Sequence, residues 1–195
     1  MLSDIFTRRT ILGVLIAVPT LSTCGSLLAT VVAADEPDDA AALKKRFEFL
    51  SQSGNVECSA KFEASIATMS PVASLQGSCC APMDEARYLQ QIKGIRTYAD
   101  IPEIPPDPYD IPAGMAQKLM SHYDLALNST EQAAYDYAMA HSDMQGPCCC
   151  KCWRWKVYGG LGKYLIHERQ FTGPQLVDLW NIASGCGGPI STKMH

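Results

Sequence analysis

The stretch Gly146-Pro147-Cys148-Cys149-Cys150-Lys151-Cys152-Trp153 places four of the nine cysteines of the chain within five residues. Neighbouring cysteines do not readily bond to one another, because a disulfide requires suitably directed Cα–Cβ bonds. In an extended segment, Cys148, Cys150 and Cys152 project from one face, and Cys149 projects from the other. Thiolates at this spacing suit a soft metal ion, which binds several sulfurs at one point. We therefore interpret this C-x-C-x-C cluster as the functional site of the protein.

Residues 1–34 have the features of an export signal or a membrane anchor. Arg8-Arg9 precedes an apolar run from Ile11 to Ala34, as in twin-arginine signal peptides, and small residues before Asp35 favour cleavage there. The run also has the ~20 apolar residues that a retained anchor needs. Cys24 lies in a poor lipidation motif. We expect export to the periplasm or to the outer face of the cytoplasmic membrane, with anchoring or lipidation as the alternatives.

Residues 35–195 are expected to form one Cys-rich helical domain, since this length is sufficient for a single core. The net charge is −4 and no basic patch is present, which argues against nucleic-acid binding. No hydrolase triad, phosphate-binding glycine loop or haem motif occurs, so we predict that the protein is not an enzyme. Without Cys24, eight cysteines remain, and an even number in an exported protein is also typical of disulfides.

The apolar periodicity predicts a mainly α fold, a single irregular helical domain with long connections rich in proline and glycine. Helices are expected at residues 40–50, 58–69, 83–95, 113–126, 131–141 and 174–183. Ser129 with Gln132 resembles a capping box, and Thr172 is a candidate cap. Five prolines in residues 101–112 predict an extended segment that packs over the core. Glycines 159, 160 and 162 are expected to interrupt the chain before a short helix at 163–168.

The predicted metal ligands are the cluster cysteines and their neighbours. Cys148, Cys150 and Cys152 would chelate together, with Cys149 or Cys186 next. Cys186 lies in a glycine-rich turn, where it would serve as a fourth ligand or as a disulfide partner of Cys149. A further group, whose role the sequence leaves open between ligands and disulfides, consists of Cys58, Cys79 and Cys80.

His141 and Met144 precede the cluster, and both residue types bind copper. A histidine at the end of a helix also interacts favourably with the helix dipole. We therefore include His141 and Met144 as candidate ligands, with a helix-end role as the alternative for His141.

The order of residues around the cluster resembles a family of exported bacterial proteins named for a PCYCGC motif. Tyr and Ala in residues 134–138 are followed by Pro147, and Cys148, Cys150 and Cys152 match the motif cysteines. This chain has Cys149 and Lys151 where the family has Tyr and Gly. The resemblance covers about 25 residues and implies an envelope protein with a cysteine site.

Residues 147–150, Pro-Cys-Cys-Cys, are also similar to the start of the copper-binding motif of the mitochondrial copper chaperone for cytochrome oxidase. In that chaperone, adjacent cysteines hold copper(I). The similarity implies copper as the cofactor in preference to zinc or an iron–sulfur cluster.

The sequence therefore predicts an exported protein that holds a soft ion, with copper(I) preferred, for storage, delivery or detoxification. Its expected partners are the metal ion and an envelope metalloprotein that receives it. The alternatives are a disulfide-stapled structural or adaptor domain, or a small electron carrier with an iron–sulfur cluster.

Overall fold

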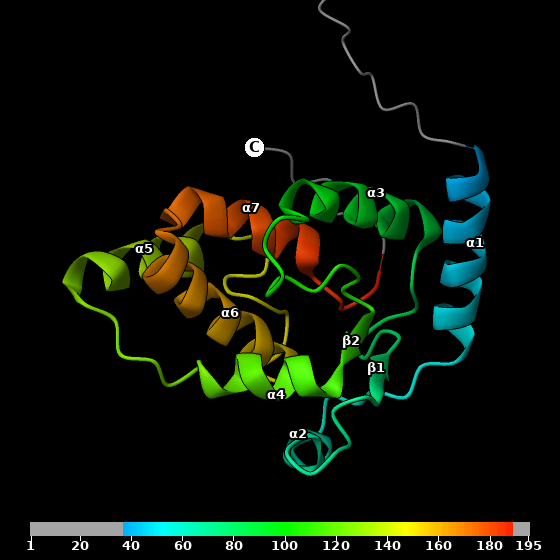
Figure 1. The fold of residues 1–195 in the computed structure, drawn as a ribbon, viewed down its shortest axis with the longest axis horizontal. Helices are drawn as coiled ribbons and strands as arrows, with labels where there is room; N and C mark the ends of the chain where they lie inside the picture. Colours follow the sequence, from blue (N-terminus) through cyan, green and yellow to red (C-terminus); the bar gives the residue numbers. More distant parts are fainter. Residues whose placement is uncertain (1–36, 189–195) are drawn as a thin grey trace, which may run out of the picture. The chain divides into compact units, whose positions relative to one another are not determined.

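Seven α-helices and a two-stranded sheet make up most of the regular structure of residues 37–188, which the computed structural model describes (Figure 1). The helices are α1 (Pro37–Gln52), α2 (Ala60–Ile66), α3 (Glu85–Ile95), α4 (Ala113–Ser121), α5 (Ser129–His141), α6 (Trp153–Arg169) and α7 (Gly173–Ala183). A short 3-10 helix, η1 (Arg96–Tyr98), follows α3. The prediction of a mainly α fold is confirmed. The predicted signal or anchor, residues 1–34, lies outside the described residues.

Side-chain caps begin several of these helices. The Asp84 side chain accepts a hydrogen bond from the backbone N–H of Arg87 at the start of α3. Thr172 and Gln175 form a capping box at the start of α7, which confirms Thr172 as a cap. The capping box of α5 is formed by Asn128 and Glu131, one residue earlier than predicted. Both Asn and Ser are good caps, so the sequence pattern did not distinguish the two registers.

Helix α6 runs without interruption from Trp153 to Arg169, so the predicted break at its glycines was wrong. A Cβ atom at Gly160 would overlap the carbonyl oxygen of Leu119 in α4. The missing side chain at Gly160 therefore lets the backbones of α4 and α6 approach closely. This close packing compensates for the low helix propensity of glycine, which costs about 1 kcal/mol relative to alanine.

The proline-rich segment, residues 101–112, crosses the core and ends in a short strand. Strand β2 (Asp110–Pro112) pairs antiparallel with β1 (Ser74–Gln76), and Leu75 lies opposite Ile111. No strand was predicted here, because three residues are too few to show an alternating pattern. Ile104, Tyr109 and Ile111 are buried, as expected of a segment that packs on the core.

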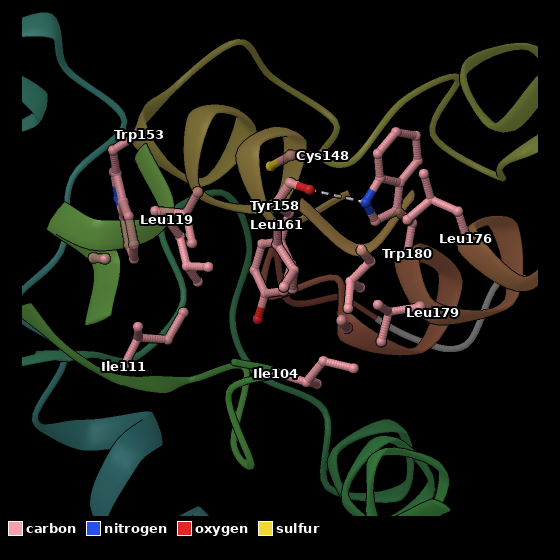
Figure 2. Packing of buried hydrophobic residues seen from close by; sticks show 14 of the residues in the cluster. Ile104, Ile111, Leu119, Cys148, Trp153, Tyr158, Leu161, Leu176, Leu179 and Trp180 are labelled. Carbon is pink, nitrogen blue, oxygen red and sulfur yellow. Dashed lines mark hydrogen bonds between the residues drawn. The ribbon is translucent and has the colours of Figure 1, made fainter. Parts of the chain in front are cut away.

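The main core lies between α4 and α6 and between α5 and α7. Trp153, Tyr158 and Trp180 are almost fully buried in it. The indole N–H of Trp180 donates to the carbonyl oxygen of Tyr158 at 3.0 Å. Figure 2 shows Cys148 among these core side chains. The cysteine cluster is therefore continuous with the hydrophobic core on one side.

Candidate metal centre

Eight cysteines from four separate segments of the chain meet at one place. Cys58 precedes α2, Cys79 and Cys80 lie between β1 and α3, and Cys186 follows α7. The segment that leads into α6 contributes Cys148, Cys149, Cys150 and Cys152. All eight are free thiols. The site thus gathers every cysteine of the described part of the chain.

Cys80 occupies the middle of this cluster. Its sulfur lies 3.4 Å from the sulfurs of Cys58 and Cys149, 3.5 Å from that of Cys150 and 3.8 Å from that of Cys79. Cys58 and Cys150 are themselves 3.5 Å apart. A residue that the sequence left undecided is therefore surrounded by four other thiols.

The sulfurs form four overlapping groups of three whose members all lie within 4.8 Å of one another. The groups are Cys58/Cys79/Cys152, Cys58/Cys80/Cys150, Cys80/Cys149/Cys186 and Cys148/Cys149/Cys150. Among residues 37–188, no group of this kind contains a histidine or a carboxylate, and none contains four ligands. The cluster can hold a metal ion, and it offers the ion sulfur ligands in sets of three.

One side of the cluster is buried and the other faces solvent. The buried cysteines are Cys148, Cys152 and Cys186, each less than 5% exposed. The exposed cysteines are Cys58, Cys80 and Cys149, while Cys79 and Cys150 are half-buried. An ion bound here would be anchored in the core and accessible at the opposite side.

The turn after α7 fixes Cys186 against the Cys79-Cys80 segment. The carbonyl oxygen of Cys186 accepts from the backbone N–H of Ala81 at 3.0 Å, and the N–H of Gly188 donates to the carbonyl of Pro82 at 2.8 Å. Gly187 has φ +75°, and a Cβ atom there would overlap the carbonyl oxygen of Ala81. A glycine at this position therefore brings Cys186 into the cluster.

Cys152 is the N-cap residue of α6, where the helix dipole favours a negative charge. Hydrogen bonds from Cys148 and from Cys79 lower the pKa of Cys152 far below its ordinary value, although burial opposes this. A hydrogen bond from Cys148, whose sulfur lies 2.9 Å away, likewise lowers the pKa of Cys186 to about 5. The pKa of Cys148 is raised by the same two hydrogen bonds and by burial. These pKa directions favour the thiolate form at Cys152 and Cys186 over Cys148.

Burial raises the pKa of the remaining perturbed thiols. It is the largest cause for Cys80, Cys149 and Cys150, and the pKa of Cys150 rises to about 12. For Cys79, the hydrogen bond to Cys152 is the largest cause and burial comes second. Accumulating further negative charge in the cluster is thus unfavourable unless a cation compensates it.

A buried arginine, Arg154, follows Cys152 in the first turn of α6. Its guanidinium donates to the carbonyl oxygens of Pro108 and Gly77 and lies 4.5 Å from the ring centroid of Trp153. None of the ion pairs described for residues 37–188 includes Arg154. Its charge lowers the pKa of Cys79, against the larger effects that raise it. Arg154 thus supplies a fixed positive charge on the buried side of the thiols.

The structure brings together all five cysteines that were proposed as ligands and adds Cys58, Cys79 and Cys80. The adjacent pair Cys79-Cys80 is visible in the sequence. Neither this pair nor Cys58 is close in sequence to the C-x-C-x-C cluster, so the sequence did not predict their contact with it. His141 is in none of the groups, because its Nδ1 lies 2.8 Å from the carbonyl of Tyr137 and its ring stacks on that tyrosine. Met144 is half-buried in the connection between α5 and the cluster.

No family model matches this chain, and neither a curated protein nor a solved structure matches it. Among the helices of the described residues, none combines the length and the apolar character needed to cross a membrane. The interpretation of the site therefore depends on its own geometry.

Proposed function

We propose that this protein binds copper(I) through its cysteine cluster and stores or delivers it in the cell envelope. The observation that supports this most strongly is the convergence of eight free thiols into overlapping groups of three. Thiolates are the ligands that a soft ion prefers. The predicted trio Cys148, Cys150 and Cys152 contributes to three of the four groups, although no single group contains the whole trio.

The number of sulfurs in each group favours copper over zinc or iron. Structural zinc is almost always held by four ligands in a tetrahedron, and Fe–S clusters also bind four cysteines. In residues 37–188, no fourth histidine, cysteine or carboxylate completes any group. Copper(I) accepts two or three thiolates, so it matches the sets of ligands that this cluster provides.

The contacts of Cys80 argue against a framework of disulfides. A sulfur atom can form one disulfide, at a length of about 2.05 Å. Cys80 instead has four other sulfurs at 3.4–3.8 Å. Multiple neighbours at such distances are expected of ligands that surround an ion.

The two sides of the cluster suggest how ions are acquired and released. Exposed Cys58, Cys80 and Cys149 can exchange an ion with another protein by ligand substitution, whereas buried Cys148, Cys152 and Cys186 retain it. This arrangement is compatible with storage, delivery or detoxification. The envelope location rests on Arg8-Arg9 and the apolar run that follows them.

The direct experiment is elemental analysis of the full chain purified without added metal, followed by competition between copper(I) and zinc(II). We expect copper to be retained and zinc to be displaced. Replacing Cys148, Cys150 or Cys152 by Ser should lower the copper affinity, because a hydroxyl is a hard, poorly ionised ligand. Lys151→Ala is the matched control and should bind copper like the parent. Equal affinity in all four variants, or preference for zinc, would contradict the proposal.

The envelope location has its own test. Replacing both Arg8 and Arg9 by Lys keeps the charge but removes the guanidinium pair that twin-arginine recognition requires. We expect this variant to remain in the cytoplasm, as shown by cell fractionation. Normal export of the double variant would remove the argument for the envelope and leave the copper site unaffected.

A further inference from the structure

We propose that the cluster holds four copper(I) ions bridged by shared thiolates, and not one ion on the C-x-C-x-C motif. This inference rests on the proposed copper function and specifies the composition of the site. Its basis is the overlap of the four groups, since four cysteines belong to two groups each. These shared residues are Cys58, Cys80, Cys149 and Cys150.

The separations between sulfurs fit one ion in each group. An ion at the centre of three sulfurs, with bonds of about 2.3 Å, places those sulfurs about 4 Å apart. The three sulfurs Cys58, Cys80 and Cys150 lie 3.4–3.5 Å from one another. A small expansion therefore admits an ion at the centre of that group.

The pattern of sharing defines a ring. Three of the groups are linked in pairs, through Cys80, Cys149 and Cys150 respectively. Three ions joined by three bridging sulfurs form a six-membered ring of alternating metal and sulfur. The remaining ligands of the ring ions are Cys58, Cys148 and Cys186.

The fourth ion lies outside this ring and is attached to it by Cys58. Its own ligands are Cys79 and Cys152, which belong to no other group. Its ligands range from exposed Cys58 to buried Cys152, and Cys152 is at the N-terminus of α6, where the helix dipole favours a negative charge. The C-x-C-x-C motif thus supplies ligands both to the ring, through Cys148 and Cys150, and to the fourth ion, through Cys152.

Charge is consistent with this composition. Eight thiolates with four copper(I) ions leave four negative charges. The charge of buried Arg154, which acts on Cys79, and the N-terminus of α6 at Cys152 offset part of that charge.

The test is a titration of the full chain with copper(I) under reducing conditions, with the bound ions counted by native mass spectrometry. We expect four ions for the parent chain. Cys79 belongs to one group, so Cys79→Ser should bind three ions, whereas Cys80 belongs to two groups, so Cys80→Ser should bind two. X-ray absorption of the loaded protein should show a copper neighbour at each copper, and circular dichroism should confirm that both variants remain helical.

The outcomes separate this inference from the proposed function. A single bound ion without a copper neighbour would overturn the bridged cluster and leave the copper function standing. Absence of copper binding would overturn both. Because the count and the copper–copper signal are measured on the parent chain, a variant that fails to fold does not prevent a decision.

Discussion

The sulfur atoms of Cys148 and Cys186 lie 2.9 Å apart, although 38 positions separate the two residues in the chain. Cys148 belongs to the segment before α6 and Cys186 to the turn after α7, so their contact requires that both helices are in place. The sulfur atoms of Cys58 and Cys80 lie 3.4 Å apart, and these two residues also come from separate segments of the chain. Metal ions held by thiols from these separate segments would therefore bind the folded chain and stabilise it.

The first prediction concerns chelation and reduction. A strong copper(I) chelator should lower the melting temperature of the loaded protein, whereas a mild reductant should not. Binding at a free ion concentration 100-fold above Kd contributes about 2.7 kcal/mol, which corresponds to about 5–10 °C for a domain of this size. Differential scanning calorimetry measures both responses. A large loss on reduction with no loss on chelation would instead identify a disulfide-stapled domain.

The second prediction concerns the reactivity of the thiols. In the metal-free chain, a short pulse of iodoacetamide should modify exposed Cys58 before it modifies Cys148, because Cys148 is buried and its pKa is raised. Loading with copper(I) should protect both of them, because a coordinated sulfur is a poor nucleophile. Peptide mass spectrometry gives the modified fraction at each cysteine. Equal labelling of exposed and buried cysteines would contradict the described arrangement.

The third prediction concerns Gly187. Alanine there would adopt φ +75° and overlap the carbonyl oxygen of Ala81. Positive φ in a non-glycine residue costs about 1–3 kcal/mol, and the overlap would shift Cys186 away from the cluster. Gly187→Ala should therefore lower both the free energy of unfolding and the copper affinity.

Gly54→Ala is the control for this variant. An added Cβ at Gly54 meets its neighbours at 3.5 Å, an ordinary contact, and its φ is not in the left-handed region. We expect a change within about 0.5 kcal/mol, as at other exposed positions. If the two variants behaved alike, Gly187 would have no special role in placing Cys186.

The fourth prediction concerns the buried charge of Arg154. Arg154→Met keeps much of the side-chain volume but removes the charge and the hydrogen bonds to Pro108 and Gly77. Each buried carbonyl left without a donor costs about 1–3 kcal/mol. The loaded protein should lose more stability than the metal-free protein, because the anionic cluster loses its compensating charge.

Lys156→Met is the matched control for Arg154→Met. Lys156 lies on the same helix but is partly exposed and pairs with Glu63 at 2.6 Å. An exposed ion pair contributes at most about 1 kcal/mol, so this variant should keep its copper-induced increase in melting temperature. An equal increase in the Arg154 variant would mean that the guanidinium acts on the fold alone.

The fifth prediction concerns pH and the proline-rich segment. Glu103 lies 3.6 Å from Lys118 and 3.4 Å from Arg169, which connects the segment to α4 and α6. Burial acts to raise the pKa of Glu103, but a hydrogen bond with Tyr164 and these two charges together bring it below its ordinary value of 4.5. A carboxyl with a lowered pKa stabilises the fold above that value and loses the effect as the pH falls through the folded-state pKa.

Thermal unfolding of the parent chain and Glu103→Gln between pH 3 and 7 measures this contribution. The parent should be more stable at neutral pH, by no more than about 1 kcal/mol because both cations are well exposed. The difference should disappear at the acidic end. A difference that grows on acidification would contradict the assigned pKa direction.

Local features of the fold could be predicted because they depend on nearby residues. Thr172 caps α7 through Gln175, three positions away, and Asp84 caps α3 in the same way. The break expected at Gly160 was wrong because its reason is distant in sequence, namely the carbonyl of Leu119. Strand β2 escaped prediction because its pairing with β1 spans more than thirty residues.

The sequence by itself determined that the chain is mainly helical and that Cys148, Cys150 and Cys152 share a short segment suited to a soft ion. Periodicity, caps and motif spacing are properties of adjacent residues, so they can be seen without the fold. The tertiary structure alone decided that Cys58, Cys79 and Cys80 join the same cluster and that the sulfurs occur in overlapping groups of three. Packing of α4 on α6 and of α5 on α7, together with the turn at Gly187, brings these distant thiols within reach of one another.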